Sequence, residues 1–283
     1  MMKGERRLIW MTRRMDTIFK PGSRGFATLV QNLGRRHQDL TYYRHSSNEF
    51  LPKLRLTMPV IPILIISDPI CPWCYIGYRT LQRAITIYQK TYPGGSRDQI
   101  TITWKPYFID QDPPECPELV NDRMLRRMQD PRQVAAAQSR LQRAAITMGI
   151  QLKFGGYIGS SRQAHRLLHI VGEEKGCESQ CQLAEKLFHA QFEREEDVSE
   201  REVLLSAAVQ AGVELEQAQT WLDDENRGLV DMERVQRDMR AQGTIHGVPH
   251  FVIGDRHLEG AMDMEELMEA LIAAKERSVS DAM

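Results

Sequence analysis

The chain has 283 residues and a formal net charge of −1, with 42% hydrophobic and 27% charged residues. This composition is typical of a globular protein with a buried core and excludes a disordered, collagen-like or coiled-coil chain. No apolar run approaches the roughly 20 residues of a membrane-spanning helix, so we expect no membrane partner. Five cysteines are too few for a small scaffold held together by disulfides.

Charge is divided unevenly along the chain. Residues 1–58 carry 12 Lys and Arg against four Asp and Glu, whereas the remaining residues carry 25 against 34. An acidic body repels the phosphates of nucleic acids, so we expect no nucleic-acid partner.

Residues 1–57 are a basic extension without the apolar core of a secretory signal, so we do not expect secretion. Their Arg-rich, acid-poor composition is typical of a mitochondrial transit peptide. It also fits a disordered leader, or sequence upstream of a true start at Met58. The expected location is therefore the cytoplasm, or the mitochondrion if the extension is a transit peptide.

The next segment predicts a strand, a helix and a second strand. Residues 60–66 are a nearly continuous β-branched run, typical of a strand buried on both faces. Apolar residues at helical spacing predict a helix over residues 74–89, and residues 100–104 alternate as a strand. The unit is typical of parallel strands joined by a helix.

The following 130 residues predict only helices, and the end of the chain returns to strands. The predicted helices cover residues 119–149, 161–174, 182–195, a segment starting at Ser199, 220–224 and 229–239. Ser199 and Glu202 match a capping box. Residues 249–253 and 256–259 predict two strands joined by a turn, and residues 263–275 predict a last helix.

This order predicts an α/β fold that is interrupted by a large all-helical insertion. The β-α-β and β-β-α segments can share one sheet only if the helical block lets the chain leave and return. We therefore expect one discontinuous domain made of residues 58–111 and 243–278, with an inserted helical domain over residues 112–242.

The sequence Cys71-Pro72-Trp73-Cys74 lies between the first strand and the first helix. At a helix N-terminus, free backbone N–H groups and the helix dipole stabilise an anion, here the thiolate of Cys71. A thiolate is the attacking species in disulfide exchange. Cys74, one turn further on, is deeper in the helix. It is close enough to Cys71 to form a disulfide with it and so to resolve the product of the first attack. Pro72 is at a first-turn position that favours proline.

Two other interpretations of this motif stay open. A C-x-x-C pair can be half of a zinc site that Cys177 and Cys181 complete, although zinc pairs usually lie on short knuckles. The pair can also be two inert buried thiols. Cys177 and Cys181 are in turn either a second redox pair or two ordinary reduced cysteines, with Gly176 indicating a loop before Cys181; Cys116 fits a surface thiol.

Gly247-Val248-Pro249 directly precedes the third predicted strand. A proline at the start of a strand after such a step is a candidate for a cis peptide bond. By itself this signal is weak, but it gains weight beside a C-x-x-C at a strand-to-helix junction.

Four segments resemble the DsbA-like thioredoxin-fold oxidoreductases, in their FrnE-type branch. They are residues 67–77 (SDPICPWCYIG), 161–167 (SRQAHRL), 247–253 (GVPHFVI) and 260–261 (GA). Glu259 and Met262 depart from the Ser and Gln that flank the last segment in that branch. The resemblance covers about residues 59–274, in order and with similar spacing.

The resemblance implies a thioredoxin-like fold with Cys71 as nucleophile, Cys74 as resolving thiol and Pro249 as a cis-proline facing them. Further residues are expected to line the active site (Pro72, Trp73, Val248, Asp68) or a substrate groove (Ser161, His165). No metal and no cofactor other than the redox-active disulfide are implied, and glutathione is open as a co-substrate. The partners would be dithiol or disulfide substrates, either proteins or glutathione, and a homodimer is open.

Two other functions stay open besides thiol–disulfide exchange. Related kappa-class glutathione transferases and 2-hydroxychromene-2-carboxylate isomerases typically have a serine where this chain has Cys71, so retention of both cysteines favours dithiol chemistry. The non-enzymatic alternative is a partner-binding module that uses the apolar surface beside Trp73 and Pro249. Since Trp73 carries no charge, we expect a less oxidising pair than in enzymes with a histidine between the cysteines.

Overall fold

The computed structural model describes residues 60–241, 243 and 245–280. The basic extension of residues 1–57, with its expected targeting role, lies outside the described residues. Within the described part of the chain, no helix has the length and apolar character needed to cross a membrane.

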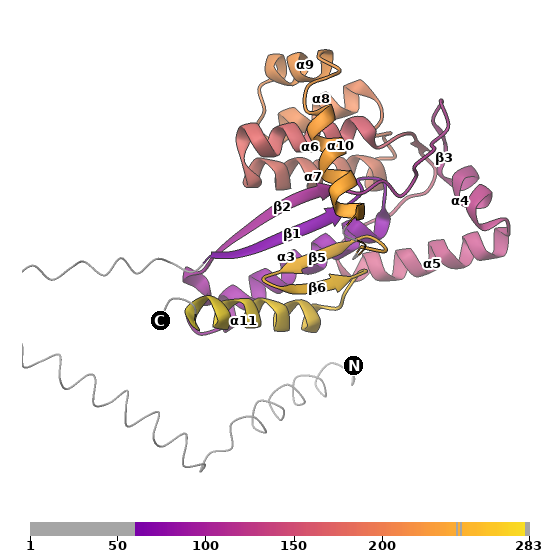
Figure 1. Ribbon diagram of the computed structural model, residues 1–283. Helices are drawn as coiled ribbons and strands as arrows, with labels where there is room; N and C mark the ends of the chain where they lie inside the picture. The colour runs from indigo at the N-terminus through magenta and orange to yellow at the C-terminus, as the bar shows by residue number, and fades with distance from the viewer. Residues whose placement is uncertain (1–59, 242, 244, 281–283) are drawn as a thin grey trace, which may run out of the picture. The chain divides into compact units, whose positions relative to one another are not determined.

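Both ends of the described chain contribute to one four-stranded sheet of order β2-β1-β5-β6 (Figure 1). β1 (Val60–Ser67) runs parallel to β2 (Gln99–Pro106) and antiparallel to β5 (His250–Ile253). β5 pairs with β6 (Arg256–Glu259) as the hairpin that the sequence predicts. The shared sheet confirms that the helical block is an insertion.

Two helices cover one face of the sheet, and inserted helices cover the other (Figure 1). α3 (Pro72–Thr91) packs beside α11 (Met264–Ser280), while α6 (Arg162–Lys175) and α7 (Cys177–Glu193) pack against β2. The prediction that the first strand is buried on both faces holds only for its C-terminal end. Val60 is exposed, whereas Ile65 and Ile66 are buried.

The insertion adds further helices around α6 and α7. They are α4 (Val120–Met128), α5 (Pro131–Thr147), α8 (Arg201–Gln210), α9 (Leu215–Asp223) and α10 (Leu229–Ala241). Aromatic rings join the insertion to the rest of the core, since Tyr75 of α3 stacks on Phe188 of α7 at 5.2 Å. The molecule is thus an α/β thioredoxin-like fold with a helical insertion. The boundaries at residues 112 and 242 stay predictions.

The single helix predicted over residues 119–149 is wrong, because the chain breaks between α4 and α5. Gln129 ends α4 with a left-handed φ of 58°, and the Asp130 side chain then accepts a hydrogen bond from the Arg132 N–H at 2.8 Å. Pro131 occupies the first turn of α5. A short antiparallel pair, β3 (Glu118–Leu119) with β4 (Tyr157–Ile158), flanks these helices and was not predicted.

Two predicted helix starts also differ. The capping box at Ser199 is wrong, because α8 begins only at Arg201, and the Asp197 side chain accepts hydrogen bonds from the backbone N–H groups of Ser199 and Gly159. The break predicted at Gly176 is present, but it is one residue long, so Cys181 lies within the next helix. Gly176, with a φ of 85°, ends α6 and leads directly into α7 at Cys177.

Candidate active site

Cys71 is the last residue before α3, at the point where the central strand β1 has just ended. The intervening turn is closed by a 3.0 Å hydrogen bond from the Cys71 N–H to the Asp68 carbonyl oxygen. Pro72 opens the helix, and the Cys71 carbonyl oxygen accepts the N–H of Cys74 at 3.0 Å. Cys71 thus lies at the end of α3 where backbone N–H groups point outward.

The two thiols differ in depth. Cys71 is 6% exposed and Cys74 only 1%, so Cys71 is the outer sulfur, as the sequence predicts. Burial raises the pKa of Cys74 well above its ordinary value, and the neighbouring Cys71 raises it further. The Ser67 side chain and the Asp68 backbone act in the opposite direction. The two cysteines are not joined by a disulfide in this structure.

A loop from the far end of the chain faces Cys71. The Cys71 thiol is 4.0 Å from the carbonyl oxygen of Val248, and the Val248–Pro249 peptide bond is cis. The structure therefore brings together the motif and the Val248–Pro249 step that the sequence analysis singled out, although they are 174 or more residues apart in the chain.

Gly77 lets α3 approach this loop, a contribution that the sequence analysis missed. A Cβ atom at residue 77 would lie 2.9 Å from Cγ of Pro249 and 3.1 Å from Cζ of Phe251. A larger residue would push the helix and the loop apart. The only sequence signal was a glycine in a predicted helix, where glycine is unfavourable unless packing needs it.

Trp73 is half-buried, and the positively charged guanidinium of Arg140 lies over its ring. The guanidinium carbon of Arg140, an exposed residue of α5, lies 5.1 Å from the ring centroid, within cation–π range. Nothing in the sequence of α5 distinguishes Arg140 from its neighbours, so this contact could not be predicted.

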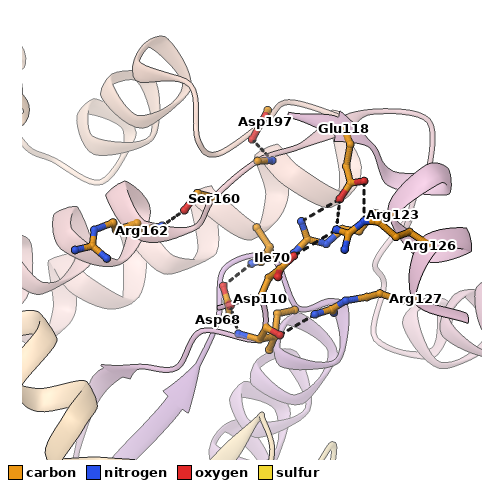
Figure 2. Close-up of polar contacts among 12 residues, drawn as sticks. Asp68, Ile70, Asp110, Glu118, Arg123, Arg126, Arg127, Ser160, Arg162 and Asp197 are labelled. Carbon is orange, nitrogen blue, oxygen red and sulfur yellow. Dashed lines mark hydrogen bonds and ion pairs between the residues drawn. The ribbon is translucent and has the colours of Figure 1, made fainter. Parts of the chain in front are cut away.

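Asp68 is fully buried and ties the active-site turn to the loop that follows β2. Its carboxylate accepts the N–H of Ile70 at 3.2 Å and the N–H of Ile109 at 2.8 Å. The Ile109 carbonyl oxygen in turn accepts a hydrogen bond from Arg127 of α4 at 2.8 Å. Figure 2 shows Asp68, Ile70 and Arg127 in this network.

A buried ion pair strengthens the same connection. Arg123 of α4 is 4% exposed and pairs with Asp110 at 2.5 Å, and both Arg123 and Arg126 reach Glu118 (Figure 2). Burial lowers the pKa of Arg123, while the negative charge of Asp110 opposes that shift. The start of the insertion is therefore fixed to the loop after β2, the same loop whose Ile109 N–H donates a hydrogen bond to Asp68.

Ser161 and His165, the two residues expected in a substrate groove, are both buried. The Ser161 carbonyl oxygen accepts the N–H of His165 at 2.9 Å. The His165 ring packs edge-on against Phe108 at 4.7 Å, and its Nε2 lies 3.4 Å from Oδ1 of Asp68. The structure thus places His165 beside the active-site turn. Substrate contact by either residue stays a prediction.

The other three cysteines form no disulfide among the described residues and have different surroundings. Cys181 of α7 accepts a 3.3 Å hydrogen bond from the indole N–H of Trp104, and burial raises its pKa to about 11. Cys177 is half-exposed one turn earlier on the same helix, and Cys116 is exposed. Among the described residues, no group of three or more His, Cys, Asp and Glu side chains could hold a metal ion.

Comparisons with known proteins agree with this fold. Residues 63–272 match the model of the DSBA-like thioredoxin domain. A probable DsbA oxidoreductase from Streptomyces coelicolor has a similar crystal structure, with 25% identity, a TM-score of 0.67 and coverage of 76% of this chain and 90% of that one. The uncharacterized Bacillus subtilis protein YwbO is 22% identical over 215 residues, which are 75% of this chain and 96% of that protein.

Two more distant structures share the fold alone. A putative protein disulfide isomerase from Nitrosomonas europaea has 18% identity and a TM-score of 0.55, over 77% of this chain and 98% of that one. A 2-hydroxychromene-2-carboxylate isomerase has 16% identity and a TM-score of 0.51, over 78% and 99%. The FrnE-type branch stays a prediction, but the family-model match covers most of the sequence, and the chain belongs to the DSBA-like thioredoxin family.

Proposed function

We propose that this protein is a thiol–disulfide oxidoreductase that works through a mixed disulfide on Cys71. The observation that carries the proposal is the arrangement of the two sulfurs. The outer one lies at the N-terminus of α3 and faces the Val248 carbonyl, and the inner one is buried one turn below. A helix N-terminus favours the thiolate that attacks, and a buried partner thiol is held in place to resolve the product.

The proposed reaction conserves electrons and protons. The Cys71 thiolate attacks one sulfur of a substrate disulfide, forms a mixed disulfide and releases the other sulfur as a thiolate. The Cys74 thiol loses its proton and attacks Cys71, so that the Cys71–Cys74 disulfide forms and the second substrate sulfur leaves. The pair is oxidised by two electrons and the substrate is reduced by two. Oxidation of a substrate dithiol follows the same steps in reverse.

We propose that the loop facing Cys71 binds a substrate segment in an extended conformation. Val248 directs its carbonyl oxygen toward Cys71, so a substrate segment could pair with this backbone like an added strand beside the reactive sulfur. The proposed substrates are protein disulfides or dithiols, with glutathione as an alternative partner. The reaction uses no cofactor other than the cysteine pair.

The variant Cys74→Ser tests this function against the alternatives. We expect it to form a mixed disulfide with a model disulfide and to stop there, because the resolving thiol is missing. Mass spectrometry of the unreduced protein should show one substrate adduct at Cys71. A variant that keeps full turnover would contradict the dithiol mechanism and favour a glutathione transferase or isomerase. Absence of any adduct would favour a binding module.

A further inference from the structure

Two helices beside the cysteine pair carry basic residues and no acidic ones. They are α3, which begins at the pair, and α5, which packs against it. Their basic residues are Arg79, Arg83, Lys90, Arg132, Arg140 and Arg143. The chain after residue 58 as a whole carries 25 Lys and Arg against 34 Asp and Glu. The two helices are therefore a basic region on a protein body that is acidic overall.

Three of these arginines follow one another along the two helices. The guanidinium of Arg140 lies 5.1 Å from the ring centroid of Trp73, which stands between the two cysteines in the sequence. Arg143 is one turn further along α5, on the same side of that helix. Arg83 reaches from α3 to the end of α5 and donates a 2.6 Å hydrogen bond to the carbonyl oxygen of Thr147. We call these three residues the basic face: Arg140, Arg143 and Arg83.

The charges of the basic face are not neutralised within the described part of the chain. All three arginines are exposed, and none of them forms an ion pair with another described residue. Arg79 differs, because it pairs with Glu185 of α7 at 2.7 Å. Arg140 and Arg143 are like charges three residues apart on one helix, which is slightly destabilising. A negative group from another molecule would relieve this repulsion.

The dimensions of the basic face match a short extended segment. A helix rises 1.5 Å per residue, so the stretch from Arg140 to Thr147 spans about 10 Å, which about three residues of an extended chain cover. A cleft of about 510 Å³ lies at its far end, between α3 and residues 146–149. Arg83, Gln82 and Thr86 are in its lining and offer polar groups to a carboxylate side chain.

We propose that the basic face binds an acidic segment of a protein substrate whose cysteine reacts at Cys71. The inference rests on the proposed function and names its substrate class, which is proteins with acidic residues within a few positions of the reactive cysteine. Charge complementarity and length favour this ligand. A nucleic acid is a longer polyanion and would extend beyond the face over a body of net negative charge, which repels it.

The proposed contact acts on docking and leaves the chemistry of the cysteines unchanged. Carboxylates attracted to the basic face bring the substrate sulfur to Cys71 more often and hold it there longer. The second-order rate constant of the first attack should therefore rise with acidic residues in the substrate. Salt should weaken the effect, since all three arginines are exposed.

Two peptides test this preference. Each has a single cysteine that is flanked on both sides by three Glu in one peptide and by three Gln in the other. The cysteine is joined through a disulfide to 2-nitro-5-thiobenzoate, which is coloured when released. Attack by the Cys71 thiolate on the peptide sulfur forms the protein–peptide disulfide and expels the coloured thiolate, which is the better leaving group because of its lower pKa.

Stopped flow with the reduced full chain gives the rate constants. The variant Cys71→Ser measures the background from the other cysteines, which is subtracted, and dithiothreitol measures the intrinsic reactivity of each peptide, which is divided out. We expect a corrected preference for the Glu peptide of about tenfold at low salt. In about 0.5 M NaCl it should fall to about twofold or less.

A double variant and a matched control locate the effect. Arg140→Gln combined with Arg143→Gln should lower the preference to about twofold or less. Lys90→Gln combined with Arg97→Gln removes the same charge from exposed residues at the other end of α3, about 28 Å along the helix from Cys71 for Lys90, and should keep the preference. If the first double variant folds poorly, Arg83→Gln gives the same test and should lower the preference about threefold.

The possible failures are distinct. Equal corrected rates of the two peptides with wild-type protein would overturn the inference alone, because Cys71 still attacks. Equal losses in the two double variants would also overturn it, by indicating an effect of net charge. So would binding of a single-stranded oligonucleotide, or a dimer, that only the Arg140 and Arg143 variant loses while neither peptide is preferred. Release of no coloured thiolate by Cys71 from either peptide would refute the proposed function itself.

Discussion

Two cysteine pairs begin two helices of this protein, and their surroundings differ. Cys71 precedes α3 and Cys74 is in its first turn, whereas Cys177 is the first residue of α7 and Cys181 lies four residues later. The outer thiol of the first pair faces the Val248 carbonyl. In the second pair, Cys181 is held by the Trp104 indole as part of the packing between α7 and β2. The two helix starts therefore differ in their surroundings, because a loop faces the first cysteine of α3, whereas Cys181 of α7 packs in the core.

The position six residues after the first cysteine sharpens the contrast. In α3 this position is Gly77, which lets the helix approach Pro249. In α7 it is Leu183, which is fully buried in the core. One helix is shaped to bring a loop against its cysteine, and the other to fill a hydrophobic interior.

The largest expected effect is the difference in disulfide-exchange activity between variants of the two cysteine pairs. Cys71→Ser should lower the rate of disulfide exchange by about 1,000-fold or more, because it removes the nucleophile. Cys177→Ser should leave the rate within about twofold. The measurement is turnover of a protein disulfide with an excess of a small thiol. Comparable losses in both variants would mean that the pairs act together and would end the distinction.

The second prediction concerns thiol reactivity. At pH 8, Cys181 should be alkylated by iodoacetamide about 100-fold more slowly than a free thiol of pKa about 8.5, because its pKa is raised to about 11. Its rate should rise as pH approaches 11. The raised pKa also implies a contribution to stability that is complete below about pH 8.5 and is lost as pH rises through 11.

Peptide mapping by mass spectrometry gives the order of labelling. Cys71 should be labelled before Cys74, which is the deeper thiol and has a raised pKa. Faster labelling of Cys74 would reverse the assigned roles.

The third prediction tests the close approach of α3 to the loop. Gly77→Ala places a methyl group 2.9 Å from Pro249, so the free energy of unfolding should fall by about 1–3 kcal/mol although alanine favours helices. Urea unfolding measures the change. Gln89→Ala on the exposed side of the same helix should alter stability by less than about 0.5 kcal/mol. A more stable Gly77→Ala variant would show that this contact is loose.

The smallest expected effect concerns Trp73. Arg140→Ala removes the cation above its ring and should lower stability by about 0.5–1 kcal/mol. Arg143→Ala, also exposed on α5, is the matched control and should change stability less. Equal effects of the two variants in urea unfolding would indicate that the contact with Trp73 contributes nothing.

The sequence predicted that Cys71 and the Val248–Pro249 step lie together because the signals for both segments are local. Cys71 and Cys74 lie on a strand-to-helix junction that propensity and periodicity reveal, and Val248–Pro249 precedes a clear strand. Gly77 and Arg140 were missed because their roles depend on contacts with segments distant in the chain. The wrong helix start at Ser199 has a local cause, because the Asp197 side chain accepts the Ser199 N–H that a capping box would give to Glu202.

The link between the turn at Asp68 and the inserted helices has a consequence for mutational tolerance. Ile109 takes part through its main chain alone, by giving its N–H to Asp68 and its carbonyl oxygen to Arg127. Replacement of its side chain by another aliphatic one therefore leaves the link intact, although the side chain also packs against the hydrophobic core. Proline is the exception, because it has no N–H to offer, so it is the one residue that would disconnect Asp68 from the loop after β2.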